Sequence, residues 1–294
     1  MVWRYFATLL VCLMPLSASA ALSVVVPVAP LAEIVQAVGG SHVSITILVP
    51  PGASLHTYEP KPMQMAAVAQ ARIYCSLGDV FDAVWVPRFR SANPQMAVLE
   101  LWSGIERIPM TAHHDDHEED HAHHDEAHPE GMPDPHIWLD PMLVARMSEK
   151  IRDALSTLDP EHAGEFRHNQ HAYQQRLIQV DASIRTLLAP IPENHRAFLV
   201  FHPAWGYFAR AYGLRQIPIE IHGKEPSPRQ LAATVRTARA TGAQVIFVQP
   251  QISTKAAQSL AREIGGTIAT LDPLAPDLSA NLERAARAIA EALH

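Results

Sequence analysis

Short apolar runs alternate with amphipathic segments along most of the chain. After residue 20, the runs LSVVVPVAP and HVSITILVP have the length and composition of strands. Between them, LAEIVQAVGG places Leu31, Ile34, Val35 and Val38 on one helical face. The runs RIYCSLG and MAVLEL continue the pattern with helical segments between them. This alternation predicts parallel strands joined by helices.

One segment is much longer than the others. Residues 161–189 contain no proline and end at Pro190. Their apolar residues recur at helical spacing: Phe166, Tyr173, Leu177, Val180, Ile184, Leu187 and Leu188. A continuous helix here would be roughly 40 Å long, which is more than one lobe requires. We therefore expect a helix that links two lobes.

The strand–helix alternation resumes after this segment with the runs AFLVF, QIPIEI, QVIFV and TIATL. The sequence thus predicts an N-terminal α/β lobe over residues 21–160, a linking helix over 161–189 and a C-terminal α/β lobe over 190–294. Two such lobes enclose a cleft, an arrangement found in enzymes and in solute-binding proteins.

Residues 1–20 do not fit this pattern. Arg4 precedes the apolar run YFATLLVCLMPL, and Ala18-Ser19-Ala20 has the small residues of a cleavage site. The run is short and contains Pro15, so it is not expected to span a membrane. We expect a cleaved export signal and a soluble periplasmic chain, in which Cys75 is the one cysteine and a buried, unreactive thiol.

Charge is concentrated in one insert. The chain has 23 basic and 30 acidic residues, and residues 112–134 hold nine carboxylates with no Lys or Arg. The insert also holds seven histidines: His113, His114, His117, His121, His123, His124 and His128. Such a polar run cannot form a core. It is either a solvated acidic loop or an auxiliary collector of borderline cations such as zinc. No basic surface for nucleic acid is indicated.

Four further residues of metal-ligand type stand at or near predicted strand ends. His56 and His136 belong to the first lobe, and His202 and Asp272 belong to the second. Ligands of open α/β sheets bind at the carboxyl ends of strands. Three imidazoles and a carboxylate can complete a tetrahedral site in the cleft. Each residue alone can equally be a cap or an ordinary surface group, and no CxxC or HExxH motif is present.

Five motifs, PGASLHTYEP, DPHIWLDP, FHPAWGYFARAYGL, GKEPSPRQL and TLDPL, occur in this order along the chain. Together they resemble the periplasmic zinc-binding proteins of ABC importers, the ZnuA-like family, over essentially the whole mature chain. The resemblance implies an α/β fold of two Rossmann-like lobes joined by a long helix. It also implies a monomeric receptor, not an enzyme, that delivers Zn²⁺ to a membrane permease with its ATPase.

Carried over by position, the resemblance implies that His56, His136 and His202 are metal ligands and that Asp272 or a water is the fourth. Histidine at 202, where manganese-binding relatives usually have Glu, favours zinc. Some zinc members have Glu where this chain has Leu55, and many have Glu where it has Gln249. Glu59, Trp138 and His222 are candidates for orienting the ligands or for purely structural roles.

Two alternatives remain open from the sequence. Manganese or iron can be the cargo of the same receptor. A secreted zinc hydrolase is also possible, but it needs an open coordination position and a general base, for which Glu59 is the one candidate.

Overall fold

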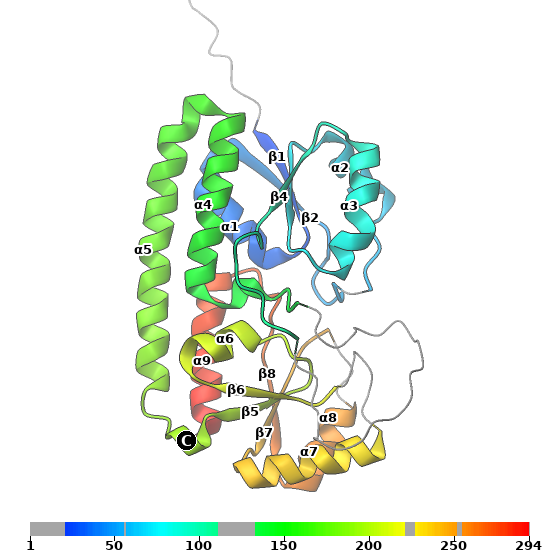
Figure 1. Cartoon of the computed structure of the whole chain (residues 1–294), viewed down its shortest axis with the longest axis vertical. Helices are drawn as coiled ribbons and strands as arrows, with labels where there is room; N and C mark the ends of the chain where they lie inside the picture. Colours follow the sequence, from blue (N-terminus) through cyan, green and yellow to red (C-terminus); the bar gives the residue numbers. More distant parts are fainter. Residues whose placement is uncertain (1–20, 56, 111–132, 221–226, 252–254, 294) are drawn as a thin grey trace, which may run out of the picture.

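The structure, a computed structural model, describes residues 21–55, 57–110, 133–220, 227–251 and 255–293. Two α/β lobes lie one above the other in Figure 1, and the long helix α5 runs along the side of both. This is the predicted architecture of two parallel-sheet lobes and a linking helix.

The N-terminal lobe contains a parallel sheet in the order β2-β1-β3-β4. Its strands are β1 (Leu22–Val26), β2 (Val43–Ile47), β3 (Ile73–Ser76) and β4 (Ala97–Glu100), and its helices are α1 (Ala29–Gly39), α2 (Pro62–Gln70) and α3 (Val80–Ala92). The central strand β1 is a run of valines buried on both faces, as parallel strands covered by helices usually are.

The C-terminal lobe repeats this topology with the order β6-β5-β7-β8, again parallel. Its strands are β5 (Ala197–Val200), β6 (Arg215–Pro218), β7 (Val245–Val248) and β8 (Thr267–Thr270), and its helices are α6 (Gly206–Tyr212), α7 (Pro228–Thr241), α8 (Lys255–Ile264) and α9 (Leu278–Leu293). Ser227 and Gln230 form the expected capping box at the start of α7.

Two long helices follow the first sheet, and the second of them contacts both lobes. Asp140 caps α4 (Pro141–Leu158) by accepting from the backbone N–H groups of Met142 and Leu143. Helix α5 (Ala163–Leu188) is 26 residues long and packs against α1, α4 and α9. The predicted apolar stripe is its buried face, except that Leu187 is only partly buried. The apolar stripe of α5 is therefore the face that packs against the core.

Alternate residues of β5 face two different cores. Phe198 and Val200 belong to the large core, which also includes the N-terminal lobe and the buried faces of α4, α5 and α9. Leu199 and Phe201 belong to a smaller core beneath α7 and α8. One continuous core therefore fixes the inner face of the second sheet to the rest of the molecule.

Cys75 is buried as expected, whereas one predicted strand is shorter than expected. Cys75 is free and buried, and burial followed by the charge of Asp82 raises the pKa of its thiol to about 12. Within the part of the chain described, no helix has both the length and the hydropathy needed to cross a membrane. The run QIPIEI was too long as a strand, since β6 ends at Pro218 and places Glu220 beyond the sheet.

Candidate metal site

His202 and Glu220 are neighbours because of the register of two paired strands. Val200 and Pro218 are partners at the ends of β5 and β6, and each site residue follows two positions later. His202 Nδ1 is hydrogen-bonded to Glu220 Oε1, and both side chains are buried. The carboxyl ends of adjacent parallel strands thus place an imidazole and a carboxylate together, at the edge where such sheets bind ligands.

His136 has a carboxylate partner from its own segment. Asp134 Oδ1 accepts from the His136 backbone N–H at 2.9 Å and lies 2.7 Å from His136 Nδ1. The Asp134 carbonyl accepts from the Tyr207 hydroxyl of α6 and from Arg107 Nε. The segment that carries His136 is therefore held by both lobes.

The two imidazoles face each other across the lobes. The ring centroids of His136 and His202 are 5.4 Å apart and the rings are steeply inclined, at 75°. Two imidazoles bound through nitrogen to one tetrahedral zinc ion have centroids about 5 Å apart, given bonds of about 2 Å. The two rings already have nearly the separation that a shared ion requires.

The carboxylates fix the orientation of these imidazoles. Histidines that bind metals commonly donate the other ring nitrogen to a carboxylate, which sets the tautomer and raises ligand basicity. Here Nδ1 of each ring is the atom on the carboxylate, which favours Nε2 as the metal-binding atom. Burial lowers the pKa of His136, and the negative charge of Asp134 only partly opposes this shift. The neutral imidazole, which is the form that binds metal, is therefore favoured.

Asp272 lies two residues after β8, at the same edge of the second sheet. Its Oδ1 accepts from Gln251 Nε2 at 2.8 Å and from the backbone N–H of Leu274 at 2.9 Å. Trp138, fully buried, donates from Nε1 to the carbonyl of Pro273, next to Asp272. Trp138 therefore ties the loop of Asp272 to the segment of His136.

The remaining predicted ligands cannot be placed in the same way. His56 and the seven histidines of the acidic insert lie outside the described residues, as does His222. Glu59 is exposed. The structure thus brings His136 and His202 together and connects Asp272 to them through Trp138.

Asp134 and Glu220 were not among the residues predicted from the sequence. Glu220 was assigned to a strand interior, where its side chain would not reach His202. The sequence signal was Pro218, which cannot donate a backbone hydrogen bond to a sheet ladder and commonly stands at a strand end or edge. Asp134 stands two residues before His136, at the spacing of a local Asx turn.

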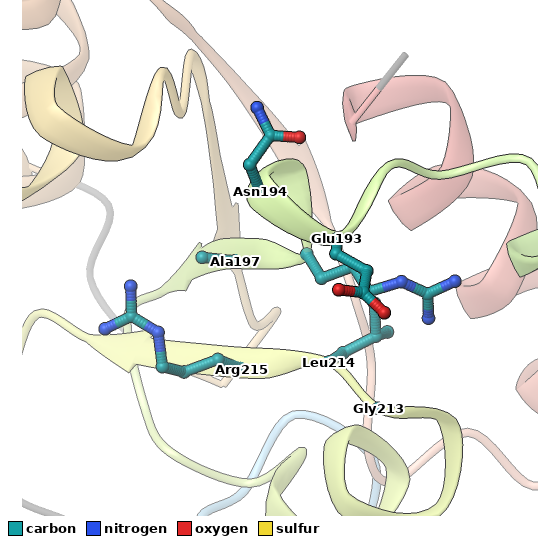
Figure 2. A pocket seen from close by; sticks show the side chains of 7 residues that line it. Glu193, Asn194, Ala197, Gly213, Leu214 and Arg215 are labelled. Atoms are coloured by element: carbon teal, nitrogen blue, oxygen red, sulfur yellow. The ribbon is translucent and has the colours of Figure 1, made fainter.

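A separate pocket of about 460 Å³ lies at the opposite edge of the C-terminal sheet. It is lined by residues that precede or begin β5 and β6, including Glu193, Asn194 and Arg215. Figure 2 shows that these three side chains do not converge on one point. The pocket is therefore distinct from the cleft and lacks its histidines.

Two Rossmann-like lobes, a helix along both and buried imidazoles meeting at the strand ends define a metal-binding receptor of the solute-binding class. The family described as zinc-uptake complex component A, periplasmic, matches residues 24–292. The chain belongs to this family.

Individual proteins agree with this assignment. A crystal structure of ZnuA superposes with a TM-score of 0.83 at 35% identity, covering 93% of this chain and all of that one. A 138–173 deletion mutant of ZnuA with zinc bound is 36% identical, with a TM-score of 0.83 over 92% of this chain and 98% of its own. The periplasmic zinc-binding protein TroA from Treponema pallidum, 20% identical, shares the fold with a TM-score of 0.80, covering 93% of this chain and 99% of its own.

Among curated proteins, zinc-binding protein AdcA of Streptococcus pyogenes serotype M3 is 28% identical over 255 residues. These residues cover 83% of this chain and 49% of AdcA. The chain therefore spans about half the length of that relative.

Proposed function

We propose that this protein captures Zn²⁺ outside the cytoplasm and delivers it to the permease of an ABC importer. The observation that carries the proposal is the pair of buried imidazoles of His136 and His202, 5.4 Å apart and each held on a carboxylate. The names of the related proteins, zinc-binding protein AdcA and ZnuA with zinc bound, support zinc as the cargo.

The proposed ligand set is His56, His136, His202 and Asp272. Nitrogen and oxygen ligands in this ratio suit a borderline cation and complete a tetrahedral shell. His56 is proposed on the motif PGASLHTYEP alone. Asp272 is proposed from its position after β8 and from the Trp138 bond to its neighbour Pro273.

The test is calorimetric titration of the mature chain with zinc, using a variant without residues 112–132, which removes the seven histidines of the insert but keeps Asp134 beside His136. One tight site is expected. Absence of a tight site in a folded sample would overturn the proposal. A second titration, of His202→Ala, separates the proposal from the ligand assignment, because unchanged affinity there would reject His202 alone.

Asp272 requires its own variant. Asp272→Asn keeps an oxygen that accepts from Leu274 N–H but removes the negative charge. If Asp272 binds zinc, the affinity falls and the visible spectrum of bound Co²⁺ changes. If a water is the fourth ligand, the spectrum of the cobalt-substituted variant stays the same.

Manganese and iron are the competing cargoes. Imidazole-rich sites bind zinc more tightly than either ion, in line with the general affinity order of divalent metals. Competition between the three ions for the cleft site, measured in the variant without the histidine insert, decides between them. A preference for Mn²⁺ or Fe²⁺ would show that this ion, and not Zn²⁺, is the cargo.

We further propose that the protein acts as a monomeric receptor and not as an enzyme, after cleavage of residues 1–20. A zinc hydrolase needs a general base beside the ion. The exposed Glu59 was the one candidate. Zinc-dependent hydrolysis of simple esters or phosphate esters by the purified chain would contradict this assignment.

The seven histidines of residues 112–134 are proposed as an auxiliary collector of zinc. Deleting residues 112–132, which leaves Asp134 in place, should slow zinc capture when zinc is scarce and leave the affinity of the cleft site unchanged. Equal capture by both forms at limiting zinc would reject this role.

A further inference from the structure

A second cluster of histidines and carboxylates lies at the far end of the N-terminal lobe. His42 ends the short 3₁₀ turn η1 (Gly40–His42) and directly precedes β2. Asp159 directly precedes the turn η3 (Pro160–His162), His162 is its last residue, and Glu165 lies in the first turn of α5. We call these four residues the outer histidine cluster. Because His42 stands before a strand, the cluster is at the sheet edge opposite the cleft.

The four side chains are joined in two imidazole–carboxylate pairs. His42 Nε2 lies 2.9 Å from Glu165 Oε2, and His162 Nδ1 lies 2.6 Å from Asp159 Oδ2. The rings of His42 and His162 are stacked, with centroids 3.8 Å apart and an interplanar angle of 25°. Ligand atoms of His42, Asp159 and His162 all lie within 4.8 Å of one another.

The surroundings hold these groups in place. Phe166 is fully buried, and its ring makes a T-shaped contact with the ring of His42. Asn169 of α5 donates to the carbonyl of Val38 at the end of α1, which fixes η1 against α5. The side chains of His42, Asp159 and His162 are each less than 30% exposed.

We propose that His42, Asp159 and His162 form a second site for a divalent cation of the zinc class. Two imidazoles and one carboxylate are a common protein ligand set for zinc, with water or Glu165 in the fourth position. The carboxylates of Asp159 and Glu165 would balance the charge of the ion. This matters at the start of α5, because the N-terminal end of a helix carries a partial positive charge. A bound ion would fasten the start of α5 to the end of α1.

Binding requires a local rearrangement. Ligand atoms on one tetrahedral zinc are about 3.4 Å apart and two imidazole centroids about 5 Å apart, so the stacked rings must separate by about 1 Å. The His162–Asp159 hydrogen bond must also be exchanged for bonds to the ion. The outer site is therefore weaker than the cleft site, and it depends on neither His136 nor His202.

Zinc-edge anomalous scattering from crystals of the full mature chain locates the ion directly. A peak is expected about 2 Å from atoms of His42, Asp159 and His162. It should disappear in His162→Ala and remain in His168→Ala, a matched change of an exposed histidine on α5. No peak under conditions that fill the cleft, or a peak that survives His162→Ala or needs a neighbouring molecule, overturns the proposal.

Hydrogen exchange tests the site in solution in the His202→Ala background, where the cleft is disabled. Zinc should slow amide exchange in residues 40–43 and 160–167, and Asp159→Asn should abolish that protection. Asp159→Asn keeps a side chain that can form hydrogen bonds. Exchange measured without zinc shows whether the variant has lost structure, which separates that effect from loss of zinc binding. If zinc does not slow amide exchange but lowering the pH does, the cluster is held by ion pairs between protonated imidazoles and carboxylates. The proposed metal site is then wrong.

Discussion

The cleft pair, His136 and His202 with their carboxylates, and the outer histidine cluster contain the same chemical groups in different arrangements. In the cleft pair the rings are inclined and 5.4 Å apart, whereas in the outer cluster they are stacked at 3.8 Å. The side chains of the cleft pair are almost completely buried, but those of the outer cluster are partly exposed. The same groups are therefore preorganised for an ion in one place and must be rearranged in the other.

Position in the fold explains the difference. The cleft pair lies between two lobes beyond the carboxyl ends of strands, so its two imidazoles come from segments of the chain that are far apart in the sequence. The outer cluster lies within one lobe at the amino end of β2, where the packing of α1 against α5 sets the geometry. The outer cluster is the more exposed of the two, whereas the cleft pair is enclosed between the lobes.

His202→Ala should have the largest effect on zinc binding. It removes a proposed ligand, so affinity at the cleft should fall by more than the roughly 10- to 100-fold lost when a supporting group is removed. Calorimetry measures this loss. His162→Ala is the matched change in the outer cluster and should leave the tight site intact; equal losses would show that the two sites are one unit.

Glu220→Gln should have the next largest effect, a loss of about 10- to 100-fold in affinity. The amide can still occupy the space beside His202 but no longer carries the charge that raises the basicity of the ring. Competition with a chelator of known affinity measures the change. Asp134→Asn at His136 should lose a similar amount, and unchanged affinity in both variants would show that the carboxylates only fill space.

Gly206→Ala should lower zinc affinity less, through Asp134. A Cβ at Gly206 would lie 2.7 Å from Asp134 Oδ2 and 3.0 Å from Ile108 Cδ1, so Asp134 must shift. Thermal unfolding should also show a loss of about 1–3 kcal/mol, as overpacking usually causes. Gly164→Ala is the control, since nothing lies within 4 Å of its added Cβ; it should keep both affinity and stability.

Asp79→Asn should have the smallest effect and none on metal binding. Asp79 caps α3 beside Asp82, in a buried carboxylate pair that has no imidazole partner among the described residues. Burial, and then the charge of Asp82, raise the pKa of Asp79 to about 7. Between about pH 4 and 7 the folded protein thus holds a proton that the unfolded chain lacks, so this group's contribution to stability falls as pH rises.

Asparagine is neutral at every pH and is also a good helix cap. The unfolding temperature of Asp79→Asn minus that of the parent chain should therefore be larger at pH 8 than at pH 5. Asp153→Asn, at an exposed carboxylate, is the control. A difference that does not change with pH would show that Asp79 is ionised in the folded protein throughout this range.

The order of apolar runs was enough to predict both sheets, their parallel strands and the long helix. Those features depend on local periodicity, and the apolar stripe from Phe166 to Leu188 can be identified from the sequence alone. His136, His202 and Asp272 were also identifiable, because motifs and strand ends mark them in the linear sequence. The metal-binding role of these three residues remains a prediction, as do the roles of His56 and of the histidines of residues 112–134 and the domain bounds.

What only the tertiary structure decided is which groups meet. Glu220 reaches His202 because β5 and β6 pair in a register that aligns Val200 with Pro218. His42 meets His162 because α1 packs against α5, which joins residues 120 positions apart in the sequence. Periodicity shows which face of an element is buried, whereas register and helix packing determine the distance between side chains on different elements. Metal binding depends on those distances.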